Sequence, residues 1–353
     1  MHSMNRRFPA SSRRQILKLG AGSAAFSTFP QILIAQENAS TVGAGEFRFE
    51  CQTDWAQLPK GHHFGGASHG TAIDSTGLIY ISHRGGPGSV FVFDPDGRFV
   101  RSMLPQHKGS GHGIDIRKEA DGVEYLYLSP ANPKMGFTKA TLEGEIIWQN
   151  GRQALSKAAE LELKQFRPTN VSFAPNDEVL LGDGYGSNYI FHCDRNGELL
   201  RSFGGPGTEN GKFSTAHGQW LDDRDGTAKT AVCDRANKRL QWFDMEGRHL
   251  RTMDGFLFPA DIDIRGEFML IPDLHSRITI LDGSNKVVAQ LGDDPVWRAR
   301  VLDKKEGMRG KGAKHWPSNR FVHPHDAVFD HDGNILVAEW VAGGRVTKLR
   351  KVG

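Results

Sequence analysis

Three histidines occupy equivalent places in a repeated pattern, and together they indicate metal chemistry. They are His112, His217 and His325; each precedes Gly or Asp and then an apolar segment, and about a hundred residues separate one from the next. In a circular repeat protein, equivalent positions of different repeats can meet on the axis. Three imidazoles around a vacant fourth position are a catalytic zinc arrangement. The spacing therefore predicts a zinc site built by distant parts of the chain.

A fourth histidine, His69, stands at the same register in the first repeat. A single histidine is more often a hydrogen-bonded structural residue than a metal ligand. Four histidines at one register in six repeats are hard to explain by packing, so we expect a metal or catalytic role for the group. The three-histidine arrangement does not require His69, which leaves it as an extra ligand, a group that supports the ligands, or a proton carrier.

The elements that must position these residues are short repeated strands. Units of about 40–60 residues recur, the period expected of propeller blades. Glycine is abundant, with 42 residues, and helical periodicity is scarce, which favours an all-β protein with tight turns. The first strands of the six units open at His69, His112, Pro168, His217, Pro259 and His325. Six units predict a six-bladed β-propeller.

The last unit has only three strands before the sequence ends. The β-patterned segment Glu46–Cys51 is predicted to supply the missing outer strand and close the ring, which would remove an unpaired sheet edge. Two stretches interrupt the repeat. Residues 154–165 are predicted to form a short helix, and residues 293–320 a long, basic loop before blade 6, of a length typical of lids and rim loops.

The first 35 residues are predicted to be a twin-arginine signal peptide, with residues 36–353 forming the propeller. Arg13 and Arg14 precede a mildly apolar run that ends near Ala35. That run is too polar for a membrane span, so we expect none in the mature chain. A disordered basic leader is the alternative. The signal implies the twin-arginine export machinery as a partner and a periplasmic or secreted location.

Charge and cysteine content exclude other classes. The formal net charge is +3, but the leader carries five basic residues and no acidic one, so the remainder is slightly acidic. We therefore expect no nucleic-acid partner. Cys51, Cys193 and Cys233 lack metal-ligand spacing, and they form either one disulfide or small buried apolar positions.

Propeller geometry predicts which residues share a face. The innermost strand starts at one mouth of the channel and the second strand returns to it, so the loops after each second strand join the histidines. This places Arg84, Tyr185 and Arg235 at the histidine mouth. The segments Asp273–His275 and Glu339–Trp340 belong to the same set. The opposite mouth receives ordinary turns.

These residues resemble the peptidyl-α-hydroxyglycine α-amidating lyase domain, a six-bladed propeller related to NHL-repeat proteins. The similarity covers roughly residues 66–350, and its densest segments are 83–85, 166–171, 182–185, 211–217, 233–237 and 323–326. The resemblance implies zinc bound by His112, His217 and His325. It also implies Tyr185 as the catalytic base, with Arg235 beside it and Arg84 on the substrate carboxylate. A structural calcium would use Asp326 and backbone carbonyls near Ile114 and Thr71.

The implied activity is that of a carbon–nitrogen lyase of the peptidylamidoglycolate type. It splits a carbinolamide, R–CO–NH–CH(OH)–COO⁻, from a small-molecule or peptide-derived source, into an amide and glyoxylate. Zinc is a Lewis acid for the hydroxyl. Free tyrosine, with a pKa of about 10, is a poor base, but a neighbouring cation favours its phenolate. The planar fork of Arg84 suits a carboxylate.

Two other functions compete with the lyase. One is a non-enzymatic propeller that binds a ligand or protein partner at the histidine-rich mouth. The other is a metal-dependent hydrolase of the gluconolactonase-like propeller type. That type usually uses carboxylate-rich calcium sites, and the histidine-rich register argues against it.

Overall fold

The computed structural model describes residues 40–353 except residue 133. The predicted signal peptide at residues 1–35 lies outside the described residues. Within the described part, no helix is both long enough and apolar enough to cross a bilayer.

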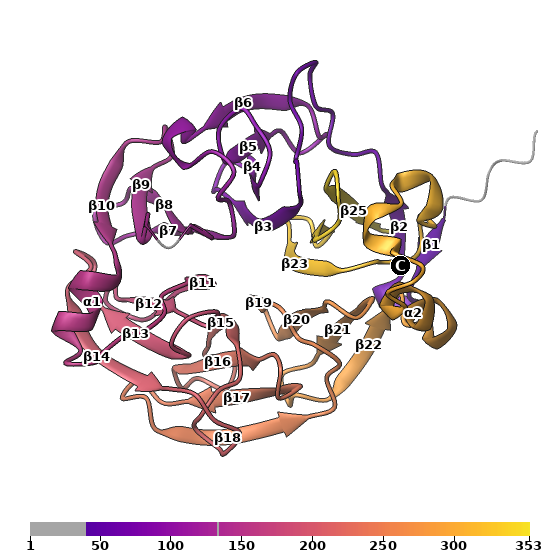
Figure 1. Ribbon diagram of the computed structural model, residues 1–353. Helices are drawn as coiled ribbons and strands as arrows, with labels where there is room; N and C mark the ends of the chain where they lie inside the picture. The colour runs from indigo at the N-terminus through magenta and orange to yellow at the C-terminus, as the bar shows by residue number, and fades with distance from the viewer. Residues whose placement is uncertain (1–39, 133) are drawn as a thin grey trace, which may run out of the picture. The chain divides into compact units, whose positions relative to one another are not determined.

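Six antiparallel sheets are arranged as blades around a central channel, which confirms the predicted six-bladed β-propeller (Figure 1). Each of the first five blades is a four-stranded meander whose first strand lies nearest the axis. Blade 1 comprises β3 Ser68–Ile73, β4 Ile79–His83, β5 Val90–Phe93 and β6 Phe99–Met103. Blade 2 comprises β7 Gly113–Lys118, β8 Glu124–Ser129, β9 Phe137–Thr141 and β10 Ile146–Asn150.

The next three blades repeat this order. Blade 3 comprises β11 Asn170–Phe173, β12 Val179–Gly182, β13 Tyr189–Cys193 and β14 Leu199–Gly204. Blade 4 comprises β15 Ala216–Asp222, β16 Lys229–Asp234, β17 Arg239–Phe243 and β18 His249–Asp254. Blade 5 comprises β19 Asp263–Arg265, β20 Phe268–Asp273, β21 Arg277–Leu281 and β22 Val287–Leu291.

Blade 6 is built from both ends of the described chain. It contains β23 Pro324–Phe329, β24 Ile335–Glu339 and β25 Arg345–Lys351, and β2 Phe49–Gln52 pairs antiparallel with β25. The predicted closing strand is therefore confirmed. Its bounds differ from the expectation, because residues Gly45–Phe47 form a 3-10 turn (η1). A short strand, β1 Thr41–Val42, extends the sheet beyond β2.

The hydrophobic core lies between neighbouring blades. Phe91 and Phe93 of blade 1 pack with Val328 and Leu336 of blade 6. Both faces of the middle strands are buried, so β5 reads as four successive apolar residues instead of an alternating pattern. The three cysteines are free thiols; Cys193 and Cys233 are buried and Cys51 is partly buried, as expected for small apolar positions.

The two interruptions differ from their predicted forms. The first helix, α1 Arg152–Ala158, is shorter than the predicted 154–165, because the chain turns at Glu160 with φ of 54°. The second stretch is not only a loop. It contains α2 Pro295–Leu302 and two 3-10 turns, η3 Met308–Gly310 and η4 Ala313–His315.

A small core of its own holds the 293–320 insertion together. Asp294 caps α2 by accepting hydrogen bonds from the backbone N–H groups of Val296 and Trp297. The buried side chains of this core belong to Trp297, Val301, Met308, Trp316, Val322 and Val341. The insertion is therefore an ordered part of the rim beside blade 6.

Candidate metal centre and the surrounding cavity

The innermost strands bring the four histidines to the channel. His69, His217 and His325 lie in β3, β15 and β23, and His112 directly precedes β7. Glycine follows three of them for a steric reason. A Cβ at Gly113 would lie 2.4 Å from the Asn170 Oδ1 of the next blade, and one at Gly218 would lie 2.4 Å from the Asp261 Cα. The neighbouring blade therefore packs directly on the residue after the histidine.

The four imidazole rings pack against one another and are almost fully buried. The ring centroids of His112 and His325 are 4.8 Å apart. His69 lies 4.9 Å from His112 and 4.6 Å from His325. His217 lies 5.1 Å from His112 and 4.8 Å from His325. His112 and His325 are thus a central pair that both other histidines contact.

Hydrogen bonds orient two of the rings. The Nδ1 of His112 lies 2.6 Å from the Thr169 carbonyl, and the Nδ1 of His217 lies 2.6 Å from the Ala260 carbonyl. Each carbonyl belongs to the residue at the equivalent register of the next blade. Such a bond fixes the tautomer and leaves Nε2 as the ligand atom, as in known metal sites.

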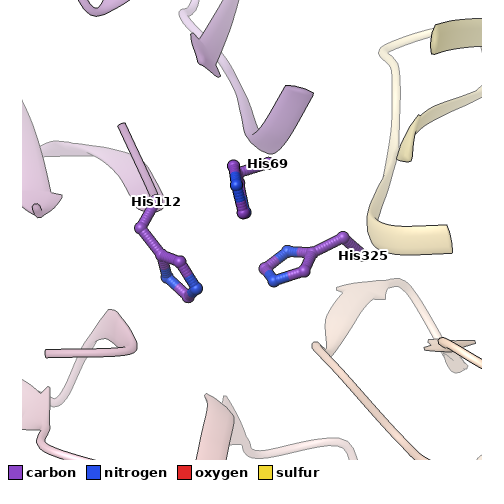
Figure 2. A group of neighbouring side chains, drawn as sticks. All are labelled: His69, His112 and His325. Atoms are coloured by element: carbon purple, nitrogen blue, oxygen red, sulfur yellow. The ribbon is translucent and has the colours of Figure 1, made fainter. Parts of the chain in front are cut away.

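Several ring nitrogens have no partner. The Nε2 of His112 and both nitrogens of His69 and His325 are buried without a hydrogen bond. Nitrogen atoms of these three residues lie within 4.8 Å of one another, and their rings surround one central space (Figure 2). Buried polar atoms are normally satisfied, so this group fits a bound cation. The donor set, imidazole nitrogen, suits zinc.

Burial also holds the histidines in the form that binds metal. Desolvation is the main cause that lowers the pKa of all four, and it lowers that of His112 to about 3. The positive charges of Arg84 and Arg235 lower the pKa of His112 further. The rings are therefore neutral near pH 7, and neutral imidazole is the ligating form.

The structure adds His69 to the expected set. His112, His217 and His325 were expected to hold zinc, and all three meet at the channel. The Nε2 of His217, however, lies 3.0 Å from the Tyr185 hydroxyl, whereas both nitrogens of His69 are without a partner. Repeat register places all four rings in one layer but does not say which three converge on one point.

Tyr185 connects the histidines to an arginine. The Nη1 of Arg235 donates a hydrogen bond of 2.8 Å to the Tyr185 hydroxyl. The Arg235 guanidinium also lies 5.4 Å from the Phe258 ring centroid, and its Nε and Nη2 are buried without a partner. The Tyr185 hydroxyl therefore lies between a guanidinium and an imidazole, within hydrogen-bond distance of both.

A cavity of about 410 Å³ covers this group at the mouth of the channel. It is lined by His69, Arg84, Arg167, Tyr185, Thr215, Arg235, Phe258, Leu274, His325 and Trp340. Five of these residues come from loops after second strands, the position that propeller geometry indicated. Arg167, Thr215 and Phe258 were not singled out. Each lies two residues before the residue that occupies the histidine position of its blade, which is Thr169 in blade 3, His217 in blade 4 and Ala260 in blade 5. This regularity could have identified them.

The carboxylates that end the second strands do not face the cavity. Asp234 pairs with Arg239 at 2.7 Å, Asp273 pairs with Arg277 at 2.9 Å, and Glu339 pairs with Arg345. Asp183 accepts hydrogen bonds from the Ser187 hydroxyl and from the backbone N–H of Arg167. These buried carboxylates anchor the loops that carry the residues of the cavity.

A layer of carboxylates lies deeper in the channel. The Asp326 carboxylate accepts a hydrogen bond of 2.6 Å from the Thr71 backbone N–H, next to the predicted calcium position. Burial raises the pKa of Asp261 and of Asp326, and raises that of Asp263 to about 6. The Oδ2 of Asp115 is buried without a partner. Carboxylate oxygens gathered at one level of the channel are the type of donor that a hard cation such as calcium takes.

Comparison with known proteins agrees with this architecture. No protein-family profile matches the chain. The chain is 27% identical over 268 residues to NHL repeat-containing protein 3 of Mus musculus, covering 69% of this chain and 76% of that protein. The Homo sapiens protein of the same name is 26% identical over 282 residues, covering 73% and 79%.

Solved structures share the fold at low sequence identity. A gluconolactonase from Xanthomonas campestris has a TM-score of 0.60 at 10% identity, covering 89% of this chain and 95% of its own. Virginiamycin B lyase from Staphylococcus aureus has a TM-score of 0.53 at 14% identity, covering 86% and 100%. Together with the six blades, the similarity to the mouse and human proteins supports an NHL-repeat β-propeller.

Proposed function

We propose that this chain is an exported, zinc-dependent lyase that cleaves the C–N bond of an α-hydroxylated glycine amide, giving an amide and glyoxylate. One observation carries the proposal: the Tyr185 hydroxyl lies between Arg235 Nη1, at 2.8 Å, and His217 Nε2, at 3.0 Å. This places a candidate base beside a group of imidazoles that can hold a metal. The solved lyase and gluconolactonase with the same fold are consistent with an enzyme.

The residues of the cavity have distinct roles in this reaction. Arg84 binds the substrate carboxylate, since its guanidinium lines the cavity and its Nε has no partner. Tyr185, held by the hydrogen bond from Arg235, takes the hydroxyl proton. The C–H carbon becomes the aldehyde carbon of glyoxylate, the C–N bonding electrons stay on nitrogen, and a proton completes the amide. Bound zinc would supply Lewis acidity toward the hydroxyl oxygen.

We assign the zinc to His112, His217 and His325. His112 and His217 each have Nδ1 fixed by a carbonyl, so each would present Nε2 to the metal. We propose that His69, which contacts the same central pair, is an extra ligand, a group that supports the ligands, or a proton carrier. A structural calcium is proposed at Asp326.

Metal analysis joined to an activity assay tests the proposal. The purified mature protein is expected to hold about one zinc per chain and to release glyoxylate from an N-acyl-α-hydroxyglycine. Zinc below about 0.2 per chain, unchanged by His217→Ala, would reject the metal site. Full zinc without glyoxylate would reject the substrate and favour a propeller that only binds a ligand.

The pair His217→Ala and His69→Ala identifies the third ligand. Loss of zinc in His217→Ala alone supports the assignment above. Loss in His69→Ala alone would transfer the site to His69, His112 and His325.

Secretion is tested separately, by replacing Arg13 and Arg14 with Lys and measuring the protein outside the cytoplasm. Unchanged export would reject the twin-arginine route.

A further inference from the structure

The cavity over the histidines is unusually rich in unpaired positive charge. Arg84, Arg167 and Arg235 line it, and no aspartate or glutamate does. None of the three forms an ion pair with a carboxylate among the described residues. Other arginines near the same mouth behave differently, since Arg239, Arg277 and Arg345 each pair with a buried acid. The blades therefore neutralise their structural arginines and leave these three facing the cavity.

Two of the three arginines already have roles in the proposed reaction. Arg235 donates to the Tyr185 hydroxyl, and Arg84 is assigned to the carboxylate of the α-hydroxyglycine unit. Arg167 has no such role, although it lies in the same place. Its guanidinium is 5.8 Å from the Tyr185 ring centroid, and its side chain is exposed.

The position of Arg167 is fixed by its backbone. Its N–H donates a hydrogen bond of 2.5 Å to the buried carboxylate of Asp183, and its carbonyl accepts one of 3.3 Å from the N–H of Tyr185. Arg167 is thus tied to the loop that carries the candidate base. Burial lowers the pKa of Arg84; Tyr185 opposes this shift, and the positive charges of Arg309 and Arg167 add to it, so the guanidinium groups of Arg84 and Arg167 are close enough to repel each other.

A substrate with one carboxylate would leave this repulsion uncompensated. Resting on the proposed function, we propose that the substrate carries a second anionic group at the end of its acyl part, and that Arg167 binds it. Phe258, Leu274 and Trp340 supply the apolar part of the lining, which suits a short hydrocarbon segment between the two charges. The substrate class is an N-acyl-α-hydroxyglycine whose acyl chain ends in a carboxylate or a phosphoryl group.

Matched substrates test this inference on the intact mature protein. N-succinyl-α-hydroxyglycine carries the second carboxylate, N-butyryl-α-hydroxyglycine replaces it with a methyl group, and an N-(3-phosphonopropionyl) analogue replaces it with a phosphonate. We expect kcat/KM for at least one dianion to exceed that of the butyryl compound about tenfold or more, the size of one charge-assisted hydrogen bond. The succinyl and phosphono compounds show which anion is preferred.

Variants show whether Arg167 causes the preference. Arg167→Gln is expected to bring the ratio of dianion to monoanion close to one, and Arg167→Lys to restore part of it. Arg98→Gln is the matched control, because it removes the same charge from an exposed turn between β5 and β6 and should leave the ratio unchanged. A preference that survives Arg167→Gln would overturn the inference.

A binding assay separates this inference from the lyase activity. N-succinylglycine and N-butyrylglycine lack the reactive hydroxyl, so their affinities can be measured by calorimetry. If no compound yields glyoxylate but N-succinylglycine binds preferentially through Arg167, the lyase fails and the two-anion ligand stands. If glyoxylate is released equally from the succinyl, phosphono and butyryl substrates, the lyase stands and the second anionic group is rejected.

Discussion

Two layers of the channel, one of histidines and one of aspartates, respond to burial in opposite directions. The two layers adjoin in the chain: His325 belongs to the first and the next residue, Asp326, to the second. Desolvation disfavours the charged form of any group. It lowers the histidine pKa values and raises those of the aspartates. Both layers therefore shift toward their neutral forms; neutral imidazole is the metal-binding form of histidine, whereas an aspartate must lose its proton to bind a cation.

The layers differ in how their polar atoms are used. Ring nitrogens of His69, His112 and His325 lack partners, and His69 and His325 line the cavity. The aspartates instead accept hydrogen bonds across blades, as Asp263 does from the Phe329 N–H at 2.7 Å and Asp261 from the Asn170 side chain at 2.7 Å. We infer that the histidine layer serves chemistry and the aspartate layer joins the blades. Nitrogen ligands suit zinc and oxygen ligands suit calcium.

The largest effect is expected from removing a metal ligand of the histidine layer. His112→Ala should remove zinc and lower kcat/KM for glyoxylate release about 10³-fold or more, because a catalytic metal contributes several kcal/mol. Asp326→Asn is the control and should keep its zinc. Metal analysis and kinetics on the two folded variants give the answer. Zinc retained in His112→Ala but lost in Asp326→Asn would reverse the assignment of the layers.

Tyr185→Phe should lower turnover about 10²-fold or more while zinc remains bound, because only the hydroxyl that accepts the substrate proton is removed. The matched control is Tyr189→Phe, since Tyr189 packs against the core between blades 2 and 3. Steady-state kinetics and metal content are measured on both. Full activity in Tyr185→Phe would remove it from the role of base.

Calcium should stabilise the protein through the aspartate layer. A ligand present at about 100 times its Kd stabilises the folded state by about 2.7 kcal/mol. The wild type should therefore melt at a higher temperature with calcium, while Asp326→Asn should show no such increase. The control Asp94→Asn, which alters an exposed turn after β5, should keep the response. An equal response in all three proteins would exclude Asp326 as a ligand.

The smallest effect concerns the pH dependence of stability. Burial raises the pKa of Asp263 from 3.8 to about 6, so the folded state binds this proton more tightly than the unfolded state. The stability from this group is complete below about pH 4 and is lost as pH rises through 6. In the metal-free protein, Asp263→Asn should therefore gain about 1 kcal/mol relative to the wild type between pH 5 and pH 7. Urea unfolding at both pH values measures this; a constant difference would contradict the raised pKa.

Repeat register is the part of the site that a sequence can reveal. The four histidines occupy the same position in the inner strands of their blades, which places His69, His112, His217 and His325 in one layer. The loops after the second strands place Arg84, Tyr185 and Arg235 beside them. Register does not give lateral distances around the axis. For that reason it could not show that His69 approaches His112 and His325 as closely as His217 does.

Irregular segments were harder to predict because tertiary contacts decide their conformation. Arg167 reaches the cavity because Asp183 fixes its backbone, a contact between segments that propensity does not encode. The 293–320 stretch was predicted to be a loop, yet Asp294 caps a helix there and Trp297 and Trp316 bury themselves in a local core. The capping residue followed by Pro295 was a local signal of this helix.

The closure of the ring at blade 6 gives the protein an order of assembly. Residues 49–52 pair with residues 348–351, so this sheet is complete only after residues 348–351 have been synthesised. His69 of blade 1 meets His325 of blade 6 where these two blades adjoin, and Thr71 meets Asp326 there too. An incomplete propeller would carry separate halves of both proposed cation sites and bind neither ion tightly. Metal occupancy would thus report that the ring has closed.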